Sequence, residues 1–116
     1  MDQIKELLKD CSDSNQFCFS MKCMLCGEEW ISTPIRFSRA QVIPETEEKR
    51  TIYEILYDKE KEYARKNAIK EAEAYFNLCP VCNKIVCDQC FMICDDLDMC
   101  SECAARFREK GEHVSE

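Results

Sequence analysis

Between Cys79 and Cys103 the chain reads CPVCNKIVCDQCFMICDDLDMCSEC. This stretch holds three cysteine pairs with two residues inside each pair, and a fourth such pair stands earlier in the chain. Two intervening residues let a tight turn aim both sulfur atoms at one metal ion. Four pairs supply the eight thiolates that two tetrahedral Zn(Cys)4 sites need. We therefore expect two Zn²⁺ ions, held by Cys23, Cys26, Cys79, Cys82, Cys87, Cys90, Cys100 and Cys103.

The spacing leaves two ways of sharing these pairs between two metals. In a sequential arrangement, pairs one and two bind one ion and pairs three and four the other, which gives a zinc ribbon followed by a treble-clef finger. In an interleaved cross-brace, pair one joins pair three and pair two joins pair four. Residues 83–86, with the sequence NKIV, are predicted to form a strand that carries the chain from one metal to the other. That link favours the cross-brace.

A length of 116 residues is typical of one domain. The region around residues 79–103 is poor in large apolar side chains, and metal binding can supply the folding free energy that it lacks. We predict one α+β zinc-binding domain spanning residues 1–116. Its expected parts are an N-terminal helix (1–12), the first knuckle with strands (17–43), a long inserted helix (44–78), the second half of the finger with a C-terminal helix (79–110), and a tail (111–116).

Residues 45–77 contain neither glycine nor proline, are rich in Glu, Lys, Ala and Tyr, and begin with acids that suit a helix N-terminus. One long helix is predicted there. Its apolar residues change face, with Ile52, Ile55, Leu56 and Tyr63 on one side and Ala68, Ile69, Ala72 and Phe76 about half a turn away. We expect the half nearer Cys79 to pack on the zinc core. The half around Ile52 is then free to meet the N-terminal helix, a second copy or another protein.

Shorter elements are predicted around this helix. Residues 3–9 place Ile4, Leu7 and Leu8 on one side of a short helix. Residues 17–22 alternate as a strand, and residues 30–43 favour one or two short strands. Gly27, directly after the first knuckle, is expected to adopt a positive φ angle.

The charge balance of the chain is acidic, with a formal net charge of −7. Because each Zn(Cys)4 centre adds two negative charges, the metal-bound chain would carry about −11. Binding to nucleic acid or to anionic lipid needs a basic surface, so both are disfavoured. A nucleic-acid-associated zinc-ribbon or treble-clef regulator, acting through Arg36, Arg39 and residues 106–108, is the alternative that stays open.

Four thiolates close the coordination sphere of zinc and leave no position for a catalytic water. A thiol oxidoreductase needs a reactive cysteine at the start of a helix, and only the pair Cys100/Cys103 precedes one. We therefore expect no enzyme activity and no small-molecule substrate. The N-terminal segment does not resemble a signal peptide and no run of about 20 apolar residues occurs, so a soluble protein in the reducing cytoplasm is expected.

The sequence of residues 79–90, CPVCNKIVCDQC, followed by Cys100-Ser101-Glu102-Cys103, resembles the second half of a FYVE-type finger. Cys23 and Cys26 match the opening pair of that family. The resemblance covers residues 21–110 without the helix at 45–77, which would be an insertion. It implies a cross-braced double zinc finger related to FYVE and PHD fingers.

The departures from this family bear on function. FYVE domains that bind phosphoinositides carry a basic stretch around the third cysteine, whereas this chain has Asn77-Leu78-Cys79-Pro80 there, and Asn83 replaces the usual glycine. The resemblance therefore does not imply lipid binding. RING ligases share the cross-brace but commonly use a histidine ligand, and the one histidine here, His113, stands in a polar tail. A non-catalytic module that binds a protein partner or a second copy through its long helix is the function that we expect.

Three cysteines, Cys11, Cys18 and Cys94, remain outside the pairs. Each is expected to be a small buried residue or a free thiol. Cys18 is expected to pack within the strand layer. Cys94 lies between pairs three and four and could replace a neighbour as a metal ligand.

Overall fold

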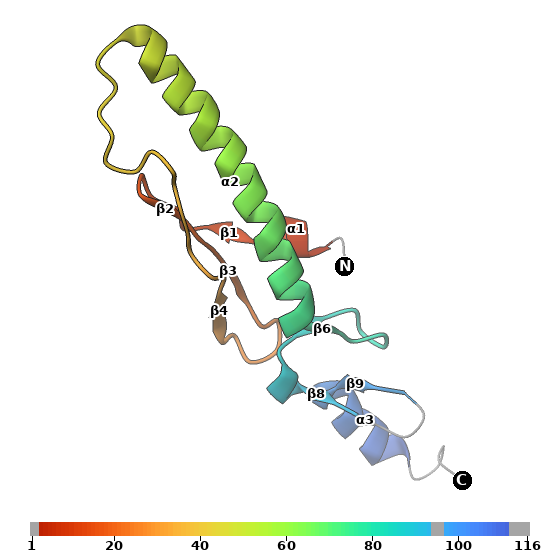
Figure 1. Ribbon diagram of the computed structural model, residues 1–116. Helices are drawn as coiled ribbons and strands as arrows, with labels where there is room; N and C mark the ends of the chain where they lie inside the picture. The colour runs from red at the N-terminus through yellow and green to blue at the C-terminus, as the bar shows by residue number, and fades with distance from the viewer. Residues whose placement is uncertain (1–2, 94–96, 112–116) are drawn as a thin grey trace. The chain divides into compact units, whose positions relative to one another are not determined.

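A computed structural model describes residues 3–93 and 97–111 of the chain. The predicted α+β class is confirmed: a long helix and short terminal helices are combined with small antiparallel strand pairs (Figure 1). The elements are α1 (Gln3–Leu7), β1 (Lys9–Asp10), β2 (Gln16–Phe17), β3 (Phe19–Lys22), β4 (Glu29–Ile31), β5 (Ile35–Arg36), α2 (Glu47–Tyr75), β6 (Asn77–Leu78), β7 (Ile85–Val86), the 3₁₀ turn η1 (Asp88–Cys90), β8 (Phe91–Met92), β9 (Met99–Cys100) and α3 (Ser101–Gly111).

The chain forms two compact units. Of the described residues, the first unit, which we call the aromatic unit, contains 3–21 and 30–72. The second, the cysteine unit, contains 22–29, 73–93 and 97–111. The division into a single domain with five parts stays a prediction.

The 29 residues of α2 confirm the long helix expected at residues 45–77. Thr46 caps its start, because the Thr46 side-chain oxygen accepts a hydrogen bond from the Lys49 amide at 3.1 Å. Glu47 and Glu48 follow in the first turn, where negative charge is stabilised by the helix dipole. At 1.5 Å per residue the helix is about 44 Å long.

Two small sheets accompany α2 in the aromatic unit, with strand orders β1-β3-β4 and β2-β5 (Figure 1). The N-terminal helix ends at Leu7, two residues earlier than predicted, and the chain continues into β1. The strand predicted at residues 17–22 is interrupted at Cys18, whose amide donates a hydrogen bond to the Ser12 hydroxyl at 3.0 Å. The strands predicted within residues 30–43 are observed as β4 and β5.

The core of the aromatic unit is a cluster of rings packed against one face of α2. Phe37 is fully buried and makes edge-on contacts with Tyr53 and Tyr57, with 5.1 Å between ring centroids in each pair. Ala64 and Ala68, one helical turn apart, join the same cluster. Their small side chains let the helix backbone approach the phenylalanine rings. The half of α2 nearer Cys79 is expected from the sequence to pack on the zinc core. This expectation is wrong for Ala68, because Ala68 packs against the aromatic rings.

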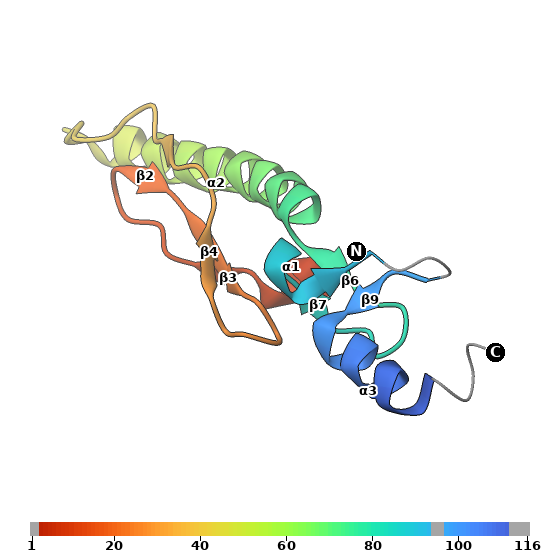
Figure 2. The same ribbon diagram turned by 90° about the horizontal axis from the view of Figure 1, so that it is seen from below.

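The cysteine unit contains two strand pairs, β6-β7 and β8-β9. Both come before α3 in the chain, and the β8-β9 pair contacts α3. Asn77 pairs with Val86 and Leu78 with Ile85, so residues 83–86 do end in the predicted strand. Figure 2 shows α3 beside β9, and α3 also contacts β8. Ile85 and Val86 are fully buried.

Within the described residues, no helix combines the length and the apolar character needed to cross a membrane.

Candidate metal centres

The first Cys-x-x-Cys pair lies in a tight knuckle that a pair of backbone hydrogen bonds closes. The Gly27 amide donates to the Cys23 carbonyl at 3.0 Å, and the Cys23 amide donates to the Glu28 carbonyl at 3.0 Å. Gly27 has a φ of 76°, as predicted. A positive φ turns the chain back after Cys26 and leaves both sulfur atoms on the same side of the turn.

The second pair is built in the same way. The Asn83 amide donates to the Cys79 carbonyl at 2.8 Å, and the Cys79 amide donates to the Lys84 carbonyl at 2.9 Å. Asn83 has a φ of 63° and so occupies the position equivalent to Gly27. Asparagine is one of the few residues that enter the left-handed region readily. The sequence feature that could have predicted this positive φ is the position of Asn83 directly after the second Cys-x-x-Cys pair, which matches the position of Gly27 after the first pair.

The four pairs come together as two groups of four. One group contains Cys23, Cys26, Cys87 and Cys90, and the other contains Cys79, Cys82, Cys100 and Cys103. Within each group all four sulfur atoms lie within 4.8 Å of one another. Pair one is grouped with pair three and pair two with pair four, so the interleaved cross-brace is confirmed over the sequential arrangement.

The sulfur separations fit a tetrahedral metal site. Tetrahedral coordination with metal–sulfur bonds of about 2.3 Å places neighbouring sulfur atoms about 3.8 Å apart. The observed Sγ–Sγ distances are 3.8 Å for Cys26 and Cys87, 3.8 Å for Cys79 and Cys103, and 3.7 Å for Cys82 and Cys100. A disulfide, by contrast, requires about 2.05 Å. The two groups are therefore consistent with two bound metal ions.

Backbone amides are directed at the sulfur atoms of both groups. In the first group Cys23 Sγ accepts hydrogen bonds from the amides of Leu25, Cys26 and Cys87, at 3.4, 3.5 and 3.3 Å. In the second, Cys79 Sγ accepts one from the Cys100 amide at 3.3 Å. Such bonds stabilise thiolates, and the amides of Cys87 and Cys100 tie each knuckle to the second cysteine pair of its own group.

These amides set the titration of the first cysteine in each group. Although burial acts in the opposite direction, the amide donors lower the pKa of Cys23 to about 6 and that of Cys79 to about 6. Burial and the neighbouring thiols raise the pKa of Cys103 to about 12 and also raise the pKa of Cys90. Four thiolates in one group thus need a compensating positive charge, which a divalent cation supplies.

Contacts outside the sulfur atoms hold the first knuckle on its partner strand. The Met24 amide donates to the Ile85 carbonyl at 3.0 Å, while the Ile85 amide donates to the Met24 sulfur at 3.3 Å. Ile85 lies two residues before Cys87, so this docking brings pair one to pair three. The sequence did not reveal it, because Met24 carries no signal beyond being apolar and next to a ligand position.

Three charged side chains near the second group, Lys84, Glu102 and Arg106, form ion pairs with one another or a hydrogen bond to a ligand sulfur. Arg106 donates to Cys103 Sγ at 3.6 Å and lies 3.6 Å from a Glu102 carboxylate oxygen. Lys84 pairs with the same carboxylate at 3.1 Å. The positive charge on Arg106 therefore partly offsets the charge of the thiolate group.

Of the remaining candidate residues, the two that the structure describes, Cys11 and Cys18, belong to neither group. Cys18 is buried in the strand layer, as expected, and its sulfur donates to the Ser32 carbonyl at 3.8 Å. Cys11 is exposed. Cys94 and His113 lie outside the described residues, so their predicted roles stay predictions.

Comparison of the chain with protein-family models, with curated proteins and with solved structures finds no match. The conclusion about the site therefore rests on its geometry. The cysteine unit is a two-site zinc-finger module in which, among the residues that the structure describes, each site groups four sulfur ligands. An all-sulfur tetrahedral site is the ligand set that structural zinc favours.

Proposed function

We propose that this protein is a non-catalytic zinc-binding module that binds another protein through the first half of α2 and the loop before it. The eight cysteines would bind two Zn²⁺ ions with closed coordination. Zinc in such a site contributes folding free energy and supplies no open position for chemistry. The module would then act as a scaffold.

The interleaved sites support a relation to the FYVE and PHD type of cross-braced finger. In this proposal α2 is an insertion between the first and second cysteine pairs, absent from the pattern that the resemblance describes. α2 packs against an aromatic cluster that is separate from the metal sites, so it is a reasonable place for a function particular to this chain.

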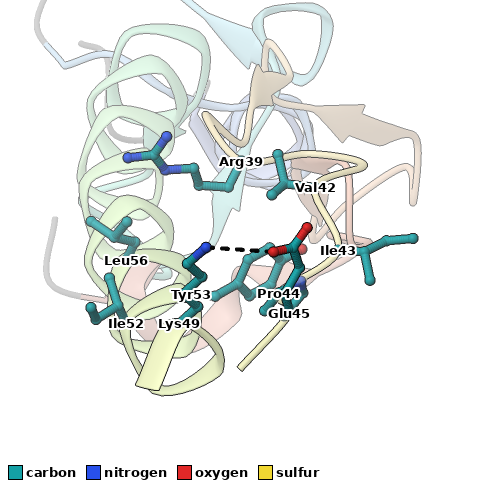
Figure 3. A pocket seen from close by; sticks show the side chains of 9 residues that line it. All are labelled: Arg39, Val42, Ile43, Pro44, Glu45, Lys49, Ile52, Tyr53 and Leu56. Atoms are coloured by element: carbon teal, nitrogen blue, oxygen red, sulfur yellow. Dashed lines mark ion pairs between the residues drawn. The ribbon is translucent and has the colours of Figure 1, made fainter. Parts of the chain in front are cut away.

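The observation that carries the interaction proposal is an apolar pocket of about 380 Å³ between α2 and the preceding loop (Figure 3). Ile43 from the loop is 85% exposed, and Ile52 from α2 is 56% exposed. Ile55, on the neighbouring turn, is 48% exposed. Exposed apolar residues gathered at a hollow are more typical of an interaction site than single scattered ones. The exposure of Ile52 and Ile55 argues against the alternative in which the N-terminal helix α1 covers this part of α2.

The charges around the pocket indicate what the partner offers. Arg39 extends from the loop toward α2 above the apolar residues (Figure 3). Lys49 on α2 and Glu45 on the loop side pair with each other at 3.7 Å across the pocket (Figure 3). A partner segment with an apolar anchor residue and a nearby carboxylate would match this pattern, with the carboxylate against Arg39.

Site-specific crosslinking tests this proposal. A photo-crosslinking amino acid at position 43 should capture a partner protein, whereas the same amino acid at position 63 should not, because Tyr63 is exposed on α2 but does not line the pocket. Ile52→Glu should abolish the crosslink, and Tyr63→Glu should preserve it. Both variants should retain two zinc ions per chain.

Two outcomes would overturn this assignment of the surface. Equal capture at positions 43 and 63, or unchanged capture with folded Ile52→Glu, would show that the pocket is not the binding site. A crosslink only between two copies of the chain, with a dimer in sedimentation analysis, would replace the partner protein by self-association.

Nucleic-acid binding is the weaker alternative. Of its three basic elements, Arg106 is already engaged by Glu102 and Cys103. Binding of the zinc-loaded chain to single-stranded or duplex DNA, measured at low and at moderate salt, tests it. Failure to bind at low salt would remove it.

A further inference from the structure

Two cysteines outside the metal groups face each other across antiparallel strands. The register of β1 and β3 pairs Lys9 with Ser20 and Asp10 with Phe19. The next opposed pair in this ladder is Cys11 with Cys18. The Cys11 amide donates to the Cys18 carbonyl at 2.9 Å, so the ladder does extend to this pair.

This placement suits a covalent bond between the two sulfur atoms. Directly opposed residues in antiparallel strands have Cα atoms about 4.5–5.5 Å apart. Disulfides join residues whose Cα atoms are about 4.4–6.8 Å apart. Opposed side chains also project on the same face of the ladder, so the thiol groups are neighbours.

The backbone at this position is held firmly from both sides. The Ser12 hydroxyl accepts from the Cys18 amide at 3.0 Å and donates to the Cys18 carbonyl at 3.2 Å. Asp10 accepts from the Ser12 amide at 2.9 Å. Both strands can therefore keep their positions when the sulfur atoms are joined.

The two thiols differ in exposure, which gives them different roles. Cys11 is exposed, whereas Cys18 is buried with 9% of its surface accessible. Burial raises the pKa of the Cys18 thiol, and the adjacent Cys11 thiol raises it further. Cys11 is thus the thiol that an oxidant in solution meets first, and Cys18 is the neighbour that can react next.

We propose that Cys11 and Cys18 are a redox modification site that closes to an intramolecular disulfide under peroxide. The Cys11 thiolate attacks one oxygen of hydrogen peroxide, the O–O bond breaks, and the hydroxide that leaves takes up a proton to form water. Cys11 is then a sulfenic acid. The Cys18 sulfur attacks Cys11 Sγ, the S–O bond breaks, and the leaving hydroxide takes the Cys18 proton as a second water. Two thiols are oxidised and one peroxide is reduced.

The disulfide would close the loop of residues 12–17, which also contacts α2. The Asp13 carbonyl in this loop accepts a hydrogen bond from the Tyr57 hydroxyl at 2.9 Å. Asp10, next to Cys11, forms an ion pair with Lys61. Oxidation would thus fix the strand ends at the contacts that join them to the helix, within the aromatic unit.

The sequence allows a direct test on the zinc-loaded chain. Trypsin cleavage after Lys9 and Lys22 releases residues 10–22, a peptide that contains Cys11 and Cys18 and no candidate metal ligand. The protein is treated with hydrogen peroxide, free thiols are blocked with N-ethylmaleimide, and the digest is measured by mass spectrometry. We expect this peptide to be unblocked, lighter by about 2 Da than its reduced form, and restored by dithiothreitol. The protein should retain two zinc ions.

Single variants test the order of the steps. In Cys18→Ser, the sulfenic acid at Cys11 has no partner and should react with dimedone, whereas Cys11→Ser should show no dimedone adduct at Cys18. Peroxide is raised until the cysteines of the zinc sites begin to oxidise. The proposal is overturned if N-ethylmaleimide still blocks both Cys11 and Cys18 of the wild-type peptide at that dose. It is also overturned if Cys11 is found only in disulfides between chains.

Discussion

The Sγ atom of Cys26 lies 3.8 Å from the Sγ atom of Cys87, although the two residues are 61 positions apart in the chain. The whole of α2 lies between them in sequence. A metal ion bound here would therefore close a long loop and fix both ends of the segment between the two cysteines. Closing a long loop costs only slightly more entropy than closing a short one, so a zinc site can join residues this far apart in the chain.

Loss of one ligand should empty one site. Replacing Cys26 by Ser removes a thiolate from the first group only, so we expect the zinc content to fall from two ions per chain to one. Metal analysis of the purified variant measures this. Cys18→Ser is the matched control and should retain two ions, because Cys18 lies in neither group. Two ions in Cys26→Ser would show that Cys26 is not a ligand.

The two knuckles should respond alike to changes at their left-handed residues: a β-branched residue should destabilise either one, and glycine should be tolerated. Gly27→Val should destabilise the protein by about 1–2 kcal/mol, because a side chain at a φ of 76° strains the backbone. No atom lies within 4 Å of a Cβ added there, so the cost is conformational and not a clash. Asn83→Gly should change stability by only a few tenths of a kcal/mol, since glycine accepts a φ of 63° freely.

Urea unfolding of the zinc-loaded variants measures these differences. Asn83→Val is the counterpart of Gly27→Val and should be destabilised to a similar degree. If Gly27→Val and Asn83→Val were as stable as the wild type, the left-handed conformation of the knuckles would be wrong.

The aromatic core should be sensitive to the loss of its central ring. Phe37→Ala should lower the free energy of unfolding by about 3–5 kcal/mol, because Phe37 is fully buried between Tyr53 and Tyr57. Ile43→Ala, at a residue that is 85% exposed, should change it by no more than about 0.5 kcal/mol. Denaturant unfolding followed by tyrosine fluorescence compares the two. Equal effects would contradict the placement of Phe37 in the core.

Removal of metal should unfold the cysteine unit. A strong chelator should collapse the amide dispersion of residues such as Val86 and Cys100, because the segment has few large side chains to replace the metal–sulfur bonds. Heteronuclear NMR before and after chelation measures this, and added zinc should restore the spectrum. An unchanged spectrum of a protein free of metal would contradict a structural role for the sites.

The metal sites could be predicted from the sequence because cysteine spacing is a local pattern with a direct geometric meaning. The cross-brace is favoured for a related reason: residues 83–86 are predicted to form a strand that carries the chain from one metal to the other, and Ile85–Val86 form β7. The long helix could also be predicted, since neither glycine nor proline interrupts residues 45–77.

Other features depend on tertiary contacts that no local pattern encodes. Ala68 faces aromatic rings because Phe17, Phe19 and Phe37 come from segments that are distant in the sequence. The strand at residues 17–22 breaks at Cys18 because the Ser12 hydroxyl hydrogen-bonds both backbone groups of that residue. The opposition of Cys11 and Cys18 follows from the register of β1 and β3, which pairs residues distant enough in the chain that no local pattern encodes it.

The interleaved pair of zinc sites is tested most directly by NMR of the chain loaded with ¹¹³Cd in place of zinc. Couplings between cadmium and the cysteine Hβ protons identify the ligands of each ion. We expect two cadmium resonances, one coupled to Cys23, Cys26, Cys87 and Cys90 and the other to Cys79, Cys82, Cys100 and Cys103. A resonance coupled to both Cys23 and Cys79, or a chain that binds no cadmium, would contradict the assignment.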